Sequence, residues 1–379
     1  MKSITLLGCG MVGTAMAADL AQTYHVLAAD QSEDALKRLV KKASVEAVRA
    51  DLSNPKIIDE LIKKADLVVG AVPGYMGFQT MKRVLESGKN MVDIAFFDED
   101  PFLLDKIARK NHVTAVVDCG VAPGISNLIL GYHAGQMELD SFECLVGGLP
   151  VIRSRPYEYK APFSPIDVLE EYTRPARLKE NGKVVTRPAL SEPELVEFPA
   201  LGTLEAFNTD GLRSLLKTQS VPNMKEKTLR YPGHIEIMRV IRETGFLSKE
   251  PVDVMGHSIR PLDLTTRLLF PLWKLGDSEP EFTVMRIILI GRQANVIKKI
   301  RYDLLDRYDA KTGFSSMART TGYSCTAAAH LILNGDYSRE GISPPEFIGT
   351  EPGCFEKMMA YQEARNIHYV RTEQIVMNR

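Results

Sequence analysis

Short apolar runs alternate with amphipathic helical patterns along the first 120 residues of the chain. The runs are rich in valine, isoleucine, leucine and alanine, which is typical of strands buried on both faces of a sheet. They cover residues 4–8, 25–30, 45–51, 66–73, 91–95 and 113–118. Helical patterns fill the intervals at 11–23, 33–42, from Pro55 onward, at 76–87 and at 101–110. This alternation predicts a doubly wound, Rossmann-type parallel sheet of the α/β class.

The pattern changes after Gly120. Residues 123–137 predict a helix, whereas the proline-rich stretch 149–202 is expected to consist largely of loops. The apolar runs 281–292 and 295–309 predict a hairpin. Two further helices are expected at 315–333 and 353–365. The second part of the chain is therefore expected to be α+β, with a mainly antiparallel sheet.

These patterns divide the 379 residues into three parts. Residues 1–122 are expected to form the Rossmann domain, and residues 123–345 a second domain. Residues 346–379 are expected to form a helical segment that packs back on the first domain. A chain of this length suits two domains.

Composition and charge exclude several classes of protein. Lys and Arg (47) nearly balance Asp and Glu (48), which argues against a nucleic-acid partner or an anionic membrane surface. No apolar run approaches the length of a membrane span. The five cysteines are scattered without a CxxC pair, which favours a reducing cytoplasm and no metal site.

Three glycines, Gly8, Gly10 and Gly13, give the spacing GxGxxG between the first predicted strand and helix. In a dinucleotide-binding turn, the first glycine permits the tight bend and the second lets the backbone approach a pyrophosphate. The third lets the helix pack closely on the strand. The amides of Met11 and Val12 open the helix and face the same phosphates. The motif alone is weak, but this strand–turn–helix context favours a nicotinamide dinucleotide.

Asp30 ends the second predicted strand, where a carboxylate should meet the adenosine ribose. A carboxylate there accepts bonds from both ribose hydroxyls and repels an additional phosphate, so NAD is expected rather than NADP. Lys37 and Arg38 lie nearby in the sequence and keep NADP as the alternative. Asp51 ends the third strand and is either an adenine contact or an ordinary strand-end residue. Val72-Pro73 follows the fourth strand and is either a cofactor contact or a simple turn.

Several blocks of the chain resemble the saccharopine dehydrogenase and L-lysine 6-dehydrogenase family. They are DCGVAPGISNLILGY (118–132), GGLP (147–150), FSPIDVLEEYTRPA (163–176), LEAFNTDGLRSL (204–215), TLRYPGHIEIM (228–238) and SMARTTGYSCTAAAHLIL (316–333). The resemblance implies a Rossmann domain followed by a catalytic domain that also carries homodimer contacts. It further implies that a nicotinamide cofactor oxidises a carbon–nitrogen bond of an amino acid. L-lysine, oxidised at its ε-amine with release of ammonia, is the first substrate expected.

Other readings of the chain stay open. Arg213 falls where saccharopine-type enzymes hold a substrate carboxylate, so saccharopine or a carboxylated polyamine, as in carboxynorspermidine dehydrogenase, is an alternative substrate. A nicotinamide-binding sensor or scaffold without catalysis is an alternative of another class.

The reaction requires a proton acceptor for the amine and a carboxylate to stabilise the developing iminium. Asp118 follows the last predicted Rossmann strand and is either such a group or a helix cap. Asp93, at the end of another strand, is a weaker candidate. His234, in the RYPGH block, is a candidate base or a structural histidine.

A substrate carboxylate is best held by arginine, and Arg213 is the leading candidate. Arg153 and Tyr159 lie in the proline-rich segment, which is either a substrate-covering loop or a solvated surface loop. Phe163 and Ser164 line the pocket by resemblance only.

Overall fold

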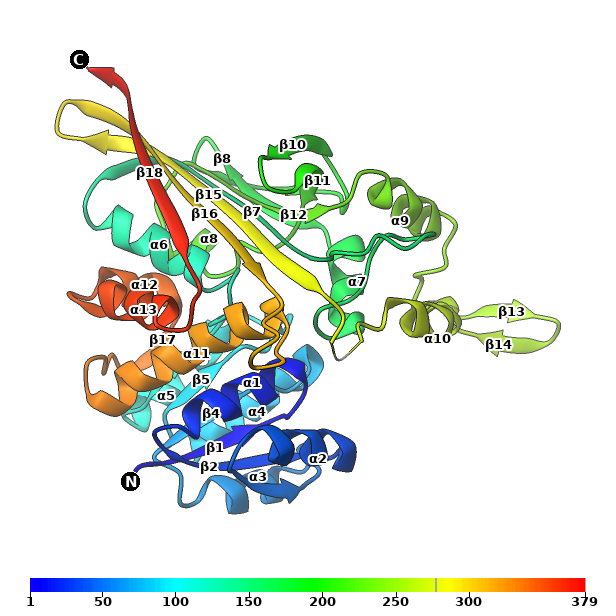
Figure 1. Cartoon of the computed structure of the whole chain (residues 1–379), viewed down its shortest axis with the longest axis vertical. Coiled ribbons are helices and arrows are strands. Elements are labelled where there is room, and N and C mark those ends of the chain that lie inside the picture. The colour runs from blue at the N-terminus through cyan, green and yellow to red at the C-terminus, as the bar shows by residue number, and fades with distance from the viewer. Residues whose placement is uncertain (277, 379) are drawn as a thin grey trace. The chain divides into compact units, whose positions relative to one another are not determined.

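The computed structural model describes residues 1–276 and 278–378, which form two compact units (Figure 1). The first unit contains Met1–Met137 and Met317–His368. The second contains Glu138–Ser316 and the chain from Tyr369 onward.

A seven-stranded parallel sheet forms the centre of the first unit. Its order is β17-β6-β5-β4-β1-β2-β3. The strands are β1 (Ser3–Leu7), β2 (His25–Asp30), β3 (Glu46–Arg49), β4 (Leu67–Gly70), β5 (Met91–Asp93), β6 (Thr114–Val116) and β17 (Gly341–Ser343). The order reverses between β1 and β4, which places a crevice at their carboxyl ends. The predicted doubly wound sheet is therefore confirmed, with β17 as an additional strand.

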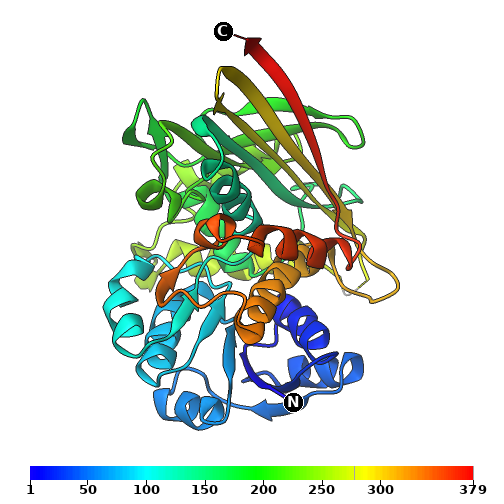
Figure 2. The ribbon, with the colours of Figure 1, turned by 90° about the vertical axis from the view of Figure 1, so that its left-hand side faces the viewer.

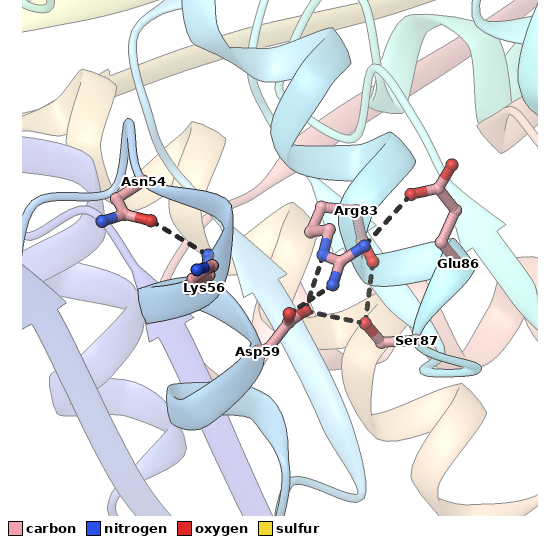
Figure 3. A network of polar contacts seen from close by, with 6 residues as sticks. All are labelled: Asn54, Lys56, Asp59, Arg83, Glu86 and Ser87. Carbon is pink, nitrogen blue, oxygen red and sulfur yellow. Dashed lines mark hydrogen bonds and ion pairs between the residues drawn. The ribbon is translucent and has the colours of Figure 1, made fainter.

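Helices cover this sheet (Figures 1 and 2). α1 (Met11–Leu20) contacts α2 (Glu33–Lys42), while α3 (Pro55–Ile62), α4 (Gly74–Glu86) and α5 (Asp105–Lys110) form a second contiguous row. A short 3₁₀ helix, η1 (Pro101–Leu104), precedes α5. Figure 3 shows how Arg83 of α4 reaches Asp59 of α3, with its Nε 2.7 Å from the Asp59 Oδ1. Ser87 also donates to the Asp59 Oδ1, at 3.1 Å.

The first unit is completed by helices from distant parts of the chain: α6 (Ile125–Ala134), α11 (Ser316–Asn334), α12 (Pro345–Thr350) and α13 (Cys354–Glu363). α6 and α12 approach closely because glycines lie at their contact. A Cβ at Gly131 would lie 2.1 Å from the Glu346 carbonyl oxygen, and one at Gly349 would lie 2.2 Å from that of Leu128.

A nine-stranded, mostly antiparallel sheet forms the centre of the second unit. Its main order is β10-β11-β12-β7-β15-β16-β18, with β8 paired to β12 and β9. The strands are β7 (Glu138–Pro150), β8 (Ala176–Glu180), β9 (Lys183–Arg187), β10 (Glu194–Phe198), β11 (Gly202–Asn208), β12 (Asn223–Arg230), β15 (Glu281–Gln293), β16 (Val296–Arg307) and β18 (Tyr369–Asn378). β12 and β7 pair in parallel. Figure 2 shows β15, β16 and β18 side by side, which includes the predicted hairpin.

Four helices and a separate hairpin accompany this sheet. The helices are α7 (Pro165–Thr173), α8 (Leu215–Thr218), α9 (His234–Glu243) and α10 (Pro261–Trp273). The hairpin consists of β13 (Val252–Val254) and β14 (His257–Ile259), which pair with each other in a sheet of their own.

Two expectations from the sequence differ from the structure. The stretch 149–202 contains α7 and the hairpin β8–β9, whose turn is Asn181-Gly182 with φ of 49° and 79°. This Asn-Gly pair is a strong hairpin signal, and the surrounding prolines obscured it. Residues 369–378 form β18, whereas the sequence predicts a helical segment over 346–379. β18 pairs along β16, so its backbone hydrogen bonds are made in the second unit rather than within a helix.

The limits of the units also differ from the expected division at 122 and 345. α6 and the chain from Met317 to His368 belong to the first unit. Nothing local in their sequences distinguishes them from helices of the second unit. Within the described ranges, no helix combines the length and apolar character needed to cross a bilayer.

Candidate functional site

The glycine turn follows β1 and opens α1. Gly8 has φ of +103°, and a Cβ there would lie 2.4 Å from the Ala71 carbonyl oxygen. A Cβ at Gly13 would lie 2.1 Å from the carbonyl oxygen of Gly8. The fold itself therefore requires glycine at both positions.

Gly10 is different, because neither its backbone conformation nor its surroundings require a glycine at this position. Its φ is −65°, and an added Cβ would meet nothing within 4 Å. Gly10 is exposed and is followed at once by Met11 and Val12, in the first turn of α1. The first helical hydrogen bond runs from the Thr14 amide to the Gly10 carbonyl, at 2.9 Å. The preceding amides and the open space at Gly10 fit the diphosphate of a dinucleotide.

Asp30, at the carboxyl end of β2, reaches back to this turn. Its Oδ2 accepts a hydrogen bond from the Cys9 amide at 2.7 Å, and its Oδ1 accepts one from the Ser32 amide at 2.7 Å. The carboxylate is half-buried, so it combines a fixed orientation with solvent access. Asp30 thus lies at the carboxyl end of β2, directly beside the glycine turn.

The other predicted cofactor residues have local roles. Asp51 accepts hydrogen bonds from the Ser53 amide (3.0 Å) and hydroxyl (2.7 Å), and these bonds lower the pKa of its exposed carboxyl. Val72 is buried beyond β4, and Pro73 is the N-cap of α4. Both lie at the same carboxyl edge as the glycine turn, because Ala71 donates to the Leu7 carbonyl at 2.8 Å.

Asp93 and Asp118 are brought together around Cys119. Asp93 ends β5, and its carbonyl accepts a hydrogen bond from the Cys119 amide at 3.0 Å. Asp118 follows β6 with φ of +52°, an uncommon conformation for a residue other than glycine. Burial, and then the nearby charges of Asp118 and Asp93, raise the pKa of the Cys119 thiol. Two buried carboxylates therefore lie at one sheet edge of the first unit, beside a thiol that stays protonated.

Arg213 lies in the second unit, in the loop before α8. It is buried, with φ of +50°, and the structure places it close to Arg174. Burial, and then the charge of Arg213, lower the pKa of Arg174. Arg177 binds Asp210 of the same loop through two hydrogen bonds of 2.8 Å. Arg213 and Arg174 thus lie close together, whereas Arg177 is paired with Asp210 and Arg174 also lies 3.8 Å from Glu170.

His234, the first residue of α9, belongs to a buried aromatic cluster of the second unit. Its Nδ1 lies 2.8 Å from the Tyr157 carbonyl oxygen and its Nε2 lies 3.0 Å from the Tyr172 hydroxyl. Because a carbonyl only accepts, Nδ1 carries the proton, and the Tyr172 hydroxyl donates to Nε2. Burial, and then the nearby Arg230, lower the pKa of His234 to about 3. His234 is therefore a neutral histidine with both nitrogens engaged.

The centre of this cluster is Arg230, whose side chain is 2% exposed. Its Nε donates to the Tyr172 hydroxyl at 2.9 Å, and its guanidinium lies 4.4 Å from the centre of the Tyr159 ring. It also pairs with Glu171. Tyr159 is thus part of the core in the second unit, in contact with Arg230 and Trp273.

The remaining predicted substrate residues, Arg153, Phe163 and Ser164, have other contacts within the second unit. Arg153 pairs with Glu158 at 2.8 Å and lies 4.5 Å from the centre of the Tyr231 ring. Phe163 packs on the hydrophobic core, and Ser164 is the N-cap of α7.

Arg174 and Arg230 are not among the site residues that the sequence predicts. Both lie inside quoted blocks, EYTRPA and TLRYPGH. Their place inside blocks that resemble the family was the available signal.

Two family models match the chain. The saccharopine dehydrogenase NADP binding domain matches residues 4–116, and the saccharopine dehydrogenase C-terminal domain matches residues 120–367. The chain belongs to the saccharopine dehydrogenase family. The predicted resemblance is thereby confirmed, and this family member carries a domain of the type that binds NAD(P).

Curated relatives of this saccharopine dehydrogenase family member are distant. The alpha-aminoadipic semialdehyde synthase of Arabidopsis thaliana is 25% identical over 258 residues, which cover 62% of this chain and 24% of that protein. The corresponding mitochondrial protein of Mus musculus is 22% identical over 91% of this chain and 45% of its own length. The chain therefore spans less than half the length of these two relatives. Saccharopine dehydrogenase [NADP(+), L-glutamate-forming] of Saccharomyces cerevisiae is 21% identical over 91% of this chain and 94% of its own length.

Solved structures show the same fold. The apo saccharopine dehydrogenase (L-Glu forming) of Saccharomyces cerevisiae superposes with a TM-score of 0.80 at 19% identity, covering 99% of this chain and 100% of that one. Homospermidine synthase of Legionella pneumophila, in complex with NAD, gives a TM-score of 0.66 at 12% identity, covering 98% and 91%. Across the described part of this family member, no group of three or more His, Cys, Asp or Glu side chains is arranged to hold a metal ion.

Proposed function

We propose that this chain is an NAD-dependent dehydrogenase that oxidises a carbon–nitrogen bond of an amino acid. The observation that carries the proposal is the glycine turn. Gly8 and Gly13 are required by the fold, whereas Gly10 leaves an open space beside the first amides of α1. That space has a function only if a ligand approaches the backbone there, and the family match supports a nicotinamide dinucleotide.

Asp30 supports NAD over NADP. Its carboxylate is fixed by the amides of Cys9 and Ser32 and would meet the adenosine ribose. A phosphate on that ribose would bring a second negative charge against it. NADP is the alternative cofactor, because the matching domain and the fungal relatives carry NADP in their names. A direct binding measurement must distinguish the two.

Asp118 and Asp93 are the proposed carboxylates of the reaction. Both are buried at the carboxyl edge where a Rossmann sheet meets its ligands. The bound cofactor would accept hydride from the carbon that bears the nitrogen. A carboxylate at Asp118 could either take the proton of the amine or, while it stays ionised, stabilise the positive charge that develops on nitrogen.

L-lysine is the first substrate proposed, from the resemblance in the sequence. Saccharopine is the second candidate, and a specific observation favours it. The buried guanidinium of Arg213 lies close to that of Arg174, and arginine is the side chain best suited to hold the additional carboxylate of such a substrate. The relatives named saccharopine dehydrogenase point to the same substrate.

The test is reduction of NAD, followed at the nicotinamide absorbance, with L-lysine, saccharopine and carboxylated polyamines offered separately. Release of ammonia identifies the lysine reaction and release of glutamate identifies the saccharopine reaction. Activity with none of them, while NAD binds in calorimetry, would contradict the enzyme proposal and favour a sensor. An Asp118→Asn variant that binds NAD normally but loses reduction would support the assigned carboxylate.

A further inference from the structure

The edge strand β3 borders the adenosine end of the proposed dinucleotide site. Arg49, the last residue of β3, pairs in parallel register with Asp30, the last residue of β2. The ladder continues one step further, because the Ala50 amide donates to the Asp30 carbonyl at 3.0 Å. Neighbouring strands lie about 4.8 Å apart, and residues in register point to the same face of the sheet. The side chains of Arg49 and Asp30 therefore extend from neighbouring positions at the carboxyl edge.

A hydrogen bond directs the Arg49 side chain towards the segment between β2 and α2. Its Nε donates to the Gln31 carbonyl at 3.2 Å. Gln31 directly follows Asp30, and the next residue, Ser32, donates its amide to the Asp30 carboxylate. The bond to Gln31 uses the single Nε hydrogen of the guanidinium, whose other four N–H groups belong to Nη1 and Nη2. Arg49 therefore holds a fork of donors beside the carboxylate assigned to the ribose.

The positive charge of Arg49 is exposed and has no ionic partner in the chain. In the part of the chain that the structure describes, its guanidinium pairs with no carboxylate. The nearby Lys37 of α2 differs, because it pairs with Glu33 at 2.8 Å. Arg38 is exposed on the same helix. Arg49 thus combines a direction fixed by the backbone with a charge that its own chain leaves for a ligand.

We propose that Arg49 determines how well the site accepts NADP, by binding the phosphate that NADP carries on its adenosine ribose. This inference rests on the proposed dinucleotide site. Asp30 binds the ribose hydroxyls of NAD, whereas Arg49 offers the additional phosphate of NADP two parallel N–H donors. A single chain therefore accepts both dinucleotides through two neighbouring residues of opposite charge.

The carboxylates around Arg49 keep NAD the preferred dinucleotide. Glu33 and Asp34 occupy the first turn of α2, and local hydrogen bonds lower the pKa of the exposed Asp51 carboxyl. Together with Asp30 these groups repel a phosphate, and the one charge of Arg49 offsets only part of that repulsion. NADP is therefore expected to bind more weakly than NAD, but measurably.

A guanidinium in this place has one other chemical use, which is stacking on the adenine ring. NAD and NADP carry the same adenine, so stacking by Arg49 would stabilise both dinucleotides equally. Phosphate binding stabilises NADP alone. The ratio of the two affinities therefore separates the two roles, and the hydrogen bond to Gln31 favours the phosphate, because it holds the guanidinium at the residue that follows Asp30.

The experiment is calorimetric titration of the full chain with NAD and with NADP, for the wild type, Arg49→Ala, Arg49→Lys and Arg38→Ala. In Arg49→Ala the affinity for NADP should fall at least about tenfold relative to that for NAD, because a charge-assisted contact is lost. Arg49→Lys keeps the charge without the fork of donors, so its ratio should be intermediate. Arg38→Ala is the matched control, because it removes the same exposed charge from α2 and should leave the ratio within about twofold.

Three results would overturn the inference. The first is a wild type that binds NAD but not NADP. The second is an Arg49→Ala variant with the affinity ratio of the wild type, and an equal loss of both affinities there would assign Arg49 to the adenine ring. The third is a change of the ratio in Arg38→Ala alone. A folded wild type that binds neither dinucleotide would instead contradict the proposed function, so the two failures can be told apart; circular dichroism checks the folding of each protein.

Discussion

The carboxylate of Asp30 accepts a hydrogen bond from the backbone amide of Cys9, across the glycine turn, at 2.7 Å. One side chain therefore fixes the turn and also occupies the place that we propose for ribose recognition. Because Ser32 donates to the other oxygen, the carboxylate is held from both sides. The proposed preference for NAD and the geometry of the turn thus depend on the same residue.

Asp30→Asn should weaken binding of NAD at least tenfold and reduce the preference over NADP. Asparagine keeps only one acceptor oxygen, so either the Cys9 amide or the Ser32 amide loses its hydrogen bond, and an unmade bond of a buried group costs about 1–3 kcal/mol. Calorimetric titration with both dinucleotides measures the effect. Asp51→Asn is the control, and it should leave the ratio of the two affinities unchanged. An unaltered ratio in the Asp30 variant would contradict the assignment.

Gly10→Ala should leave the thermal midpoint within about 2 °C of the wild type while weakening dinucleotide binding at least tenfold. An added methyl group at Gly10 meets none of the chain's own atoms but enters the space assigned to the diphosphate. Gly13→Ala provides the contrast: its methyl group would collide with the Gly8 carbonyl and lower the stability by about 1–3 kcal/mol. Differential scanning fluorimetry with and without NAD separates the two effects. Full binding by the Gly10 variant would be the adverse result.

Asp19→Asn should destabilise the first unit by about 3–5 kcal/mol, because it breaks a buried ion pair. Asp19 of α1 accepts bonds from the Arg365 Nε at 2.6 Å, the Thr326 hydroxyl at 2.5 Å and the Tyr361 hydroxyl at 2.6 Å. Urea unfolding followed by circular dichroism measures the change. Asp59→Asn, at the more exposed contact of Figure 3, should cost clearly less. Equal losses in the two variants would show that burial does not decide the strength of the pair.

His234→Gln should make the protein less sensitive to acid. The folded pKa of about 3 lies below the unfolded value of about 6.5. The unfolded chain therefore binds a proton first as the pH falls. The stability that His234 contributes is complete above pH 6.5 and is lost towards pH 3, by about 1.4 kcal/mol per pH unit. The variant should lack this component when unfolding in urea is compared at pH 7.5 and 4.5.

His368→Gln is the matched control for this experiment, because His368 is exposed. It should retain the acid sensitivity of the wild type. A pH–rate profile of the His234 variant adds a second readout. Since His234 stays neutral at neutral pH, any ionisation seen between pH 6 and 8 should persist without it. Loss of that ionisation would restore His234 as the proton acceptor.

The first unit could be predicted almost strand by strand. β1, β2, β4 and β5 are buried parallel strands, and their uninterrupted apolar runs follow directly from that burial. The strands of the second unit were harder to predict from the sequence. Its strands β8, β9 and β10 are short and partly exposed, and they lie among prolines, so their local patterns are weak.

The residues of the candidate site also differ in how far the sequence predicts that they lie together. Gly8, Gly13 and Asp30 belong to a continuous strand–turn–helix–strand segment, so their spacing reveals their relation. Arg174 and Arg213 are 39 positions apart and meet only because the sheet and α7 bring their loops together. The same folding buries His234 between Tyr157 and Tyr172, which lowers its pKa.

The sequence by itself determined the parallel sheet, the glycine turn and the family, because these depend on neighbouring residues and on burial periodicity. Only the tertiary structure decided that β17 joins the first sheet and β18 the second, and which charged groups lie together. Backbone hydrogen bonds between strands, and the electrostatic environment of a side chain, depend on distances in space that no local pattern encodes.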